Sequence, residues 1–345
     1  MFNRLTTYRW RTTLVQKSPR MLRRLLNGFL QRVADDVDAD GRLLRRFARE
    51  MTSANVTHML PGLEVLSSFV EAARRLGGLN IRYLVTFQSY EVCLNGTDDP
   101  DLKRRLMAVI HESVNRSDFP AIAVGKHYRE RILREIGLVS DQIVVLHPCV
   151  EEPTHLPPEI EGKLVADTFP GFQAAVPLVA FVGRQDVEKG LDLLLYAAAL
   201  CRSNGFEFQL LICGPSALGN SYGQICRQIA SHLQLPVMWG GMVSDELRSA
   251  IFQMSRVVVY PSIHGEPYGM APMEAMLHGS QAIVAENSGI VDNNPDVLTF
   301  PAGDSRSLAN CMAVALRNNR QLKPVYTTPR QLAGQLMAMI VGQHE

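Results

Sequence analysis

The chain of 345 residues lacks several patterns that point to particular classes of protein. Its six cysteines include no Cys-x-x-Cys spacing, so neither a zinc site nor a disulfide framework is indicated. No apolar run approaches the roughly 18–20 residues of a membrane span. The first residues also lack the apolar stretch and small-residue cleavage site of a signal peptide. These absences predict a cytoplasmic protein with reduced thiols.

Acidic residues are missing from positions 1–32, although the net charge of the whole chain is only +1. Within residues 20–33, apolar side chains recur at helical spacing opposite four arginines. Such a basic amphipathic helix can lie on an anionic membrane surface, or it can pack on its own domain with a solvated basic face. Both interpretations stay open. No aromatic-interleaved basic patch or motif indicates a nucleic-acid partner.

One stretch has the pattern of a strand, a loop and a helix. The continuous apolar run 257–260 is typical of a buried parallel strand. Gly269 allows the backbone to approach a ligand, and Pro272 suits the first position of a helix. The unpaired N–H groups at such a helix start can bind a phosphate or another anion. Two carboxylates frame the loop, Glu266 before it and Glu274 in the first helical turn.

A carboxylate beside a phosphate site is suited to binding sugar hydroxyls, because like charges repel. The segment Glu266-Pro-Tyr-Gly-Met-Ala-Pro-Met-Glu274-Ala-Met resembles the paired-glutamate signature of the retaining GT-B glycosyltransferases of glycosyltransferase family 4. The alternative interpretation of the same segment, without a ligand site, is an ordinary strand, turn and helix with two solvated acids.

A second element agrees with the first. Residues 177–182 form another apolar run, which ends in Gly183-Arg184, and Lys189 follows five residues later. This order places two cations at the carboxyl edge of a parallel sheet, where doubly wound sheets bind ligands. The resemblance assigns both cations to the diphosphate of the sugar donor. No metal ion and no other cofactor is then expected, because the cations and the helix start would stabilise the leaving group.

The resemblance also implies a role for each carboxylate. Glu274 would bind the donor ribose, while Glu266 would contact the donor sugar and stabilise a cationic transition state. The implied catalytic set is Glu266, Arg184 and Lys189. The implied donor-binding set is Gly183, Arg184, Lys189, Met242, Tyr268, Gly269, Met270, Ala271 and Glu274.

The amino-terminal half resembles the family less closely. Nothing in residues 1–50 matches the usual opening strand, Gly-Gly loop and helix. Gln88 stands where many relatives have a histidine that faces the donor sugar; glutamine exchanges hydrogen bonds but cannot take up a proton.

The expected fold is α/β of the GT-B type, with two Rossmann-like domains facing a cleft and the amino-terminal one incomplete. The predicted parts are a truncated amino-terminal domain at 1–152, a linker at 153–175, a donor-binding domain at 176–320 and a carboxy-terminal helix at 321–345.

These features predict a retaining glycosyltransferase that moves a sugar from a nucleotide-diphosphate donor to a hydroxyl acceptor in glycan, polysaccharide or glycolipid biosynthesis. Its partners would be the nucleotide sugar and a glycan or lipid-linked acceptor, with a peripheral contact to the inner face of a membrane through residues 20–33 as the further expectation. Two alternatives stay open: a non-catalytic nucleotide-sugar-binding or regulatory subunit, and a nucleotide-sugar epimerase.

Overall fold

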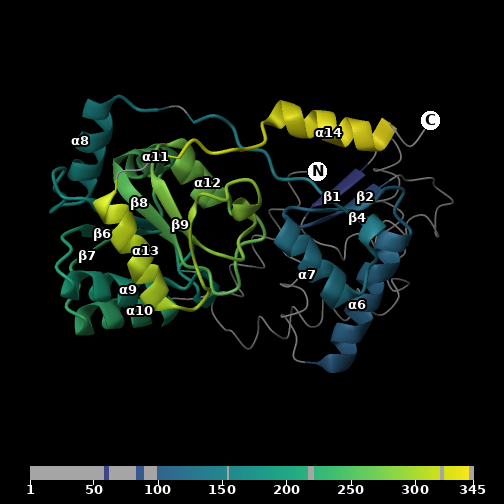
Figure 1. The fold of residues 1–345 in the computed structure, drawn as a ribbon, viewed down its shortest axis with the longest axis horizontal. Helices are drawn as coiled ribbons and strands as arrows, with labels where there is room; N and C mark the ends of the chain where they lie inside the picture. The colour runs from purple at the N-terminus through teal and green to yellow at the C-terminus, as the bar shows by residue number, and fades with distance from the viewer. Residues whose placement is uncertain are drawn as a thin grey trace, which may run out of the picture. The chain divides into compact units, whose positions relative to one another are not determined.

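The computed structural model describes residues 58–61, 83–88, 99–153, 155–216, 221–318 and 322–341. These residues divide into two compact units, one with the residues up to His147 and those from Leu332 on, the other with Pro148–Gln331. Each unit is built on a parallel sheet with helices against it (Figure 1). The α/β class expected from the sequence is therefore confirmed. The predicted basic helix at residues 20–33 lies outside the described residues.

The first unit contains a four-stranded parallel sheet in the order β1-β2-β3-β4. Its strands are β1 (His58–Pro61), β2 (Tyr83–Phe87), β3 (Ala121–Ala123) and β4 (Ile143–Val145), and its helices are α6 (Pro100–Asn115), α7 (Lys126–Ile136), the short η2 (Ser140–Gln142) and α14 (Pro329–Val341). Helix α14 packs three apolar side chains, Leu336, Met339 and Ile340, on a cluster that includes Leu84 and Phe119. The last helix of the chain thus completes the core of this first unit.

The second unit contains a six-stranded parallel sheet in the order β10-β9-β8-β5-β6-β7. Its strands are β5 (Leu178–Val182), β6 (Gln209–Cys213), β7 (Val237–Trp239), β8 (Ser255–Tyr260), β9 (Gln281–Ala285) and β10 (Leu298–Phe300). Its helices are α8 (Pro158–Thr168), η3 (Val187–Lys189), α9 (Leu191–Ser203), α10 (Ser221–His232), α11 (Asp245–Met254), α12 (Met270–Leu277), η4 (Gly289–Asp292) and α13 (Ser305–Arg317).

The strand order of this second sheet reverses between β5 and β8. From β5 the chain runs outward to β7, and from β8 it runs outward in the other direction to β10. Alternate strand residues such as Phe181 and Val259 share one apolar core with α9, α10 and α13. Helices α11 and α12 lie on the other side of the sheet (Figure 1). In such a sheet the ligand crevice lies outside the carboxyl ends of the strands at the reversal.

Local sequence signals account for most of these elements, with three differences. Ser244 caps α11 as expected, because its Oγ accepts a hydrogen bond from the Leu247 backbone N–H at 3.2 Å. Helix α12 begins at Met270, so Pro272 is its third residue, and Glu274 lies in the second turn rather than the first. The proline-rich segment predicted as a linker contains α8, which starts at Pro158; a proline is tolerated there because the first N–H groups of a helix have no partner.

The five described cysteines are free thiols, and Cys201, Cys213 and Cys226 are buried. Burial raises the pKa of Cys201 to about 11 and that of Cys213 to about 12. Such thiols are poor nucleophiles at neutral pH, because the reactive form is the thiolate. The buried thiols therefore serve as core side chains.

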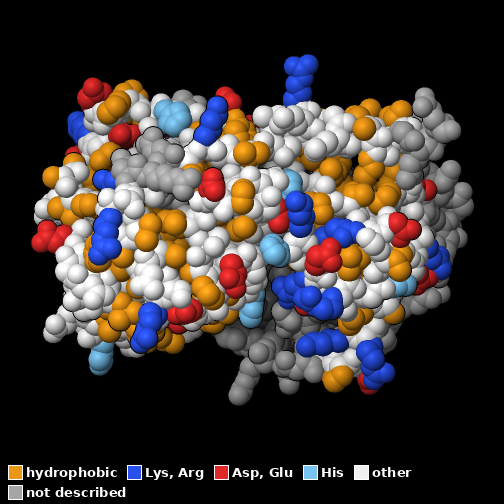
Figure 2. Space-filling view, viewed as in Figure 1, with side chains coloured by type: hydrophobic (Ala, Val, Ile, Leu, Met, Phe, Trp, Pro, Cys, Tyr) orange, Lys and Arg blue, Asp and Glu red, His pale blue; other side chains and the backbone are white. Residues whose placement is uncertain are grey.

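Charged side chains of both signs are mixed on the first unit. Figure 2 shows Lys and Arg gathered over α6 and α7, with acids among them. Several arginines pair with acids four residues earlier or later in the chain, as Arg116 does with Glu112 and Arg131 with Glu135. Exposed pairs of this kind contribute little to stability. Across the described parts of both units, no helix has the length and apolar character needed to cross a membrane.

Candidate functional site

The loops after β5 and β8 lie side by side at the carboxyl edge of the second sheet. The two strands pair directly, and the Ile263 backbone N–H donates to the Glu188 carbonyl at 2.9 Å. Gly190 begins α9 with φ of 61°, and a Cβ there would lie 2.1 Å from the Pro261 carbonyl oxygen. Only glycine permits both this left-handed backbone and this approach. The contact brings Lys189, the residue before Gly190, to the loop after β8.

Lys189 and Glu266 form an ion pair across these two loops. The Lys189 Nζ lies 2.5 Å from the Glu266 Oε1, and the side chains are 24% and 18% exposed. The Ser262 hydroxyl donates to the same Oε1 at 2.5 Å. The Glu266 backbone is fixed as well, because its N–H donates to Ser288 Oγ at 3.3 Å and its carbonyl accepts from the Gly289 N–H at 2.9 Å. Two residues 77 positions apart in the sequence thus meet at the strand reversal.

Arg184 lies in the same loop as Lys189 and is more open to solvent. Its side chain is 57% exposed, and its guanidinium lies 3.2 Å from Asp186 Oδ2. Asp186 also accepts a hydrogen bond from the Lys189 backbone N–H at 3.1 Å, which caps η3. Buried Gln185 donates from its amide to the Gly214 carbonyl at 2.8 Å and so ties this loop to the loop after β6. The loop is rigidly held while its guanidinium remains accessible to an anion.

The start of α12 offers backbone N–H groups to a ligand. Gly269 precedes the helix with φ of 109°, and no side chain caps its first turn. Met270 is 39% exposed, whereas Tyr268 is buried, which raises the pKa of its phenol to about 12. A ligand at this helix start would therefore meet the Tyr268 backbone rather than its ring. Uncapped helix starts favour anions.

Glu274 faces α11 one turn further along α12. Its Oε2 lies 3.5 Å from the Arg248 Nε, and the side chain is 28% exposed. Burial is the main cause that raises the pKa of Glu274 above its ordinary value of 4.5; Arg248 opposes this shift and Asp245 adds to it. Arg248 has no signal in the local sequence, because its approach to Glu274 depends on how α11 packs on α12.

Tyr260 is a second site neighbour that local sequence patterns did not reveal. Its ring is buried at the end of β8, and its hydroxyl has no hydrogen-bond partner among the described residues. Burial, followed by the charges of Glu274 and Glu266, raises the pKa of Tyr260 far above 10. Buried hydroxyls usually have a hydrogen-bond partner. The unpaired Tyr260 hydroxyl therefore adds one more polar group to the two carboxylates at this edge of the sheet.

The remaining predicted residues lie in four different segments of the two units. Met242 is 80% exposed in the loop after β7, and this loop is fixed by a hydrogen bond from the Gly214 N–H to the Gly241 carbonyl at 2.8 Å. Gly183 and Ala271 are half-buried in the loop after β5 and in the first turn of α12. Gln88 belongs to the first unit, directly after β2, and its side chain is exposed. The role of each in binding stays a prediction.

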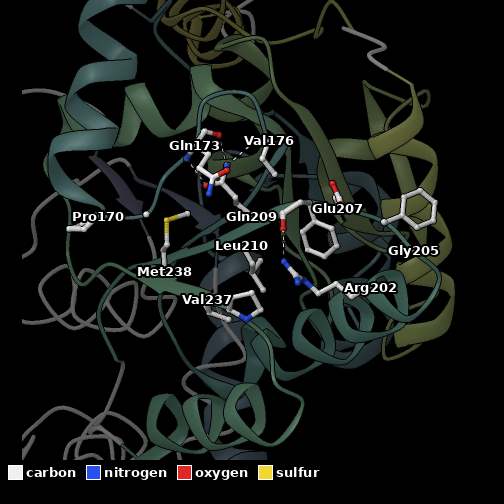
Figure 3. Close-up of a pocket in the computed structure, with 14 residues that line it drawn as sticks. Pro170, Gln173, Val176, Arg202, Gly205, Glu207, Gln209, Leu210, Val237 and Met238 are labelled. Atoms are coloured by element: carbon white, nitrogen blue, oxygen red, sulfur yellow. Dashed lines mark hydrogen bonds between the residues drawn. The ribbon is translucent and has the colours of Figure 1, made fainter.

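A cavity of about 710 Å³ opens at the opposite edge of the second sheet, at the amino ends of β6 and β7 (Figure 3). Its polar groups bind one another: the Gln209 amide donates to the Gln173 carbonyl at 2.7 Å, and Arg202 donates to the Phe208 carbonyl at 2.8 Å. These contacts fasten the segment before β5 to the sheet. The cavity is separate from the loops that carry Lys189 and Glu266.

Within the described ranges, no three or more His, Cys, Asp or Glu side chains are arranged to hold a metal ion. Two of the histidines in these ranges, His127 and His264, are exposed, and the His147 Nδ1 lies 3.1 Å from the Val124 carbonyl oxygen. The groups available to bind a ligand at the sheet edge are thus cations, carboxylates, a hydroxyl and backbone N–H groups.

Comparison with known proteins finds a family match within the second unit. Residues 176–318 match the family described as "Glycosyl transferases group 1". The phosphatidyl-myo-inositol mannosyltransferase of Mycobacterium leprae is 26% identical over 226 residues, which are 62% of this chain and 58% of that protein. An uncharacterized glycosyltransferase of Methanocaldococcus jannaschii is 25% identical over 175 residues, 50% of this chain and 43% of the relative. The chain thus spans about half the length of these curated relatives.

Solved structures resemble a larger part of the chain. Anabaena HepE in complex with UDP and glucose aligns with a TM-score of 0.70 at 16% identity, over 88% of this chain and 83% of HepE. Sucrose-phosphate synthase from Thermosynechococcus elongatus aligns with a TM-score of 0.64 at 20% identity, over 89% of this chain and 78% of the synthase. At these identities the similarity concerns the fold alone, and it confirms the GT-B fold expected from the sequence. Residues 176–318 therefore match the glycosyl transferases group 1 family, within a chain that has the GT-B fold.

Proposed function

We propose that this protein is a retaining glycosyltransferase that transfers a sugar from a nucleotide-diphosphate donor to a hydroxyl acceptor. The observation that carries the proposal is the 2.5 Å contact between Lys189 and Glu266 at the strand reversal, within the residues that match the family. A cation that can bind diphosphate lies there beside a carboxylate that can bind sugar hydroxyls. Breaking a bond between a sugar and a phosphate requires both of these functions.

In this proposal three groups neutralise the leaving diphosphate. Arg184 offers a planar fork to the phosphate oxygens and Lys189 a compact charge. The uncapped start of α12, from Tyr268 through Gly269 and Met270 to Ala271, adds backbone N–H groups. Groups that are already in place when charge develops stabilise the transition state without reorganisation. The proposed transfer accordingly uses no metal ion.

The carboxylates and the neighbouring loop bind the rest of the donor. Glu266 contacts the sugar hydroxyls and stabilises positive charge at the anomeric carbon, and Glu274 accepts hydrogen bonds from the ribose. The loop with Met242 lies under the base, and Gln88 contacts the donor sugar. Anabaena HepE, which shares the fold, forms a complex with UDP and glucose, and this supports a nucleotide sugar as the donor here.

The acceptor in this proposal is a glycan or a lipid-linked molecule. Supporting this, the M. leprae relative is named for transfer of mannose to phosphatidyl-myo-inositol, a lipid. The biosynthesis of a glycan, polysaccharide or glycolipid is the corresponding role.

A non-catalytic nucleotide-sugar-binding subunit is the second candidate, and one observation favours it. Apart from Gln88, the residues proposed to bind the donor all lie in the second unit, at one edge of its sheet. Such a subunit would bind the donor through the second unit and lack an acceptor site. Donor binding without hydrolysis or transfer, across glycan and lipid acceptors, would favour this candidate.

The donor site is tested through Glu274. Glu274→Ala is expected to weaken nucleotide-sugar binding about 10- to 100-fold, because a hydrogen bond to a charged group contributes roughly 1.5–3 kcal/mol. Calorimetry with UDP- and GDP-sugars in the presence of EDTA measures this affinity. Burial raises the pKa of Glu274, so we expect affinity to decrease on acidification at a higher pH than for an ordinary glutamate.

The matched control for this experiment is Glu159→Ala, which removes an exposed carboxylate from α8 in the same unit. It should leave affinity unchanged. Glu274→Gln should remove the loss of affinity at acidic pH. Equal affinity in wild type and Glu274→Ala would exclude Glu274 from the site, and a wild type that binds no nucleotide sugar would contradict the proposed function.

The membrane contact is tested through the basic segment at residues 20–33. We propose that this segment binds anionic lipid, because its arginines lie opposite an apolar stripe in the sequence. Deletion of residues 1–34 is expected to abolish co-sedimentation with phosphatidylglycerol vesicles, while wild type and variant behave alike with phosphatidylcholine vesicles. Substitution of Arg20, Arg23, Arg24 and Arg32 by Gln in the full chain is the control for charge alone. If the deletion leaves co-sedimentation undiminished, or if it lowers solubility instead of abolishing co-sedimentation, the result would argue for a helix that packs on the protein.

A further inference from the structure

The Ser262 hydroxyl differs from the hydroxyls of two other buried serines of the second unit in what it binds. Ser255 and Ser280 are buried as well, and their hydroxyls donate to backbone carbonyls, that of Ser255 to Ile251 at 2.6 Å and that of Ser280 to Phe252 and Ser255. Bonds of this kind satisfy polar groups in a core. Ser262 is 3% exposed, yet its hydroxyl donates to the carboxylate of Glu266 at 2.5 Å.

Both side-chain contacts of Glu266 fall on one oxygen. The Ser262 hydroxyl and the Lys189 ammonium each lie 2.5 Å from Oε1, whereas Oε2 has no partner among the described residues. A carboxylate whose backbone and one oxygen are fixed has little freedom to rotate. Its second oxygen therefore keeps one direction, and the 18% exposure of the side chain leaves it accessible to a ligand.

We propose that Ser262 is a positioning residue that holds Oε1 of Glu266 so that Oε2 faces the sugar of the donor. This inference rests on the proposed function. The serine has a task that Lys189 cannot perform alone, because the diphosphate of a bound donor attracts the ammonium and competes with Glu266 for it. The neutral Ser262 hydroxyl has no such competitor. It keeps Glu266 oriented after the lysine has turned toward the phosphates.

Ser262→Ala separates this positioning role from a structural one. Loss of the hydroxyl is expected to weaken binding of the nucleotide sugar about tenfold, while affinity for the matching nucleoside diphosphate stays within about twofold, because only the sugar contact depends on Glu266. The probe is the best-bound donor among UDP-glucose, UDP-galactose and GDP-mannose, with UDP or GDP as its partner. Turnover at saturating donor should decrease about 10- to 100-fold, as expected when a reacting group is misplaced.

Ser280→Ala is the matched control. Ser280 is also 3% exposed, and its hydroxyl binds backbone carbonyls rather than the site. Both variants should unfold at similarly lowered temperatures, but only Ser262→Ala should lose the preference for nucleotide sugar over nucleoside diphosphate. If Ser262→Ala changes the affinity for the nucleotide sugar and for the nucleoside diphosphate equally, or if that variant keeps full turnover, the positioning role is overturned and the proposed function is left intact. A wild type that binds none of the nucleotide sugars would instead overturn the proposed function and this inference with it.

Discussion

Replacing Lys189 by alanine is expected to lower turnover by about two orders of magnitude or more, because the variant lacks one of the fixed charges that stabilise the departing diphosphate. The ammonium is held 2.5 Å from Glu266 Oε1, and the Lys189 side chain is 24% exposed, so the residue is fixed in place and partly open to a ligand. Initial rates of donor hydrolysis and of transfer, at saturating donor and in the presence of EDTA, measure the effect.

The control for the loss of one positive charge is Lys163→Ala, on the exposed side of α8. It should retain wild-type turnover, which separates a local contact from a change in net charge. Thermal unfolding of both variants checks that Lys189→Ala is folded. Undiminished turnover in Lys189→Ala would remove the residue from the reaction, and a wild type that binds donor without turnover would support the non-catalytic subunit.

Replacing Glu266 by glutamine is expected to have opposite effects on rate and on diphosphate binding. Turnover should decrease about 10²-fold or more, because the variant loses the negative charge that stabilises the cationic sugar in the transition state. Binding of the nucleoside diphosphate should stay equal or tighten, since Lys189 is released from its ion pair and a like charge beside the phosphates is gone. Calorimetry with UDP or GDP and steady-state rates give the two quantities.

Glu188→Gln is the matched control for Glu266→Gln. Glu188 lies in η3 next to Lys189, its side chain is exposed, and only its backbone carbonyl contacts the loop after β8. Its neutralisation changes the charge near the site without touching the proposed sugar contact, so turnover should remain at the wild-type level. Comparable losses of turnover in both variants would show that net charge near the site, rather than the Glu266 contact, controls the rate. NMR of the wild-type product should show the anomeric configuration of the donor, and inversion would contradict the retaining mechanism.

Much of the second unit was predictable from short stretches of sequence. The apolar run at 257–260 is the end of β8, and the run before Gly183 is β5. Ser244 signals the start of α11, and Gly269 the turn before α12. These signals are reliable because each depends on neighbours within one turn or strand: a continuous apolar run suits a buried parallel strand, and a serine hydroxyl suits a helix start.

Prolines were the weaker signal. The cluster between positions 153 and 171 suggested a linker and gave no sign of α8, which Pro158 opens. The pattern of the loop after β8 suggested a helix start at Pro272, yet α12 begins at Met270. Proline is equally compatible with the first turn of a helix and with a segment that has no helix. In neither case is a backbone N–H needed for a helical hydrogen bond, so its absence from proline costs nothing. Contacts of the surrounding chain decide between them.

Sequence alone determined that two cations and two carboxylates follow apolar strands, and therefore that they lie at the carboxyl edge of a parallel sheet. The tertiary structure decided which of them meet. Lys189 reaches Glu266 because β5 pairs with β8, and Glu274 reaches Arg248 because α12 packs beside α11. Burial of Ser262 against Glu266 follows from the same pairing. Strand order and helix packing depend on contacts between distant residues, whereas local patterns report only on neighbours along the chain.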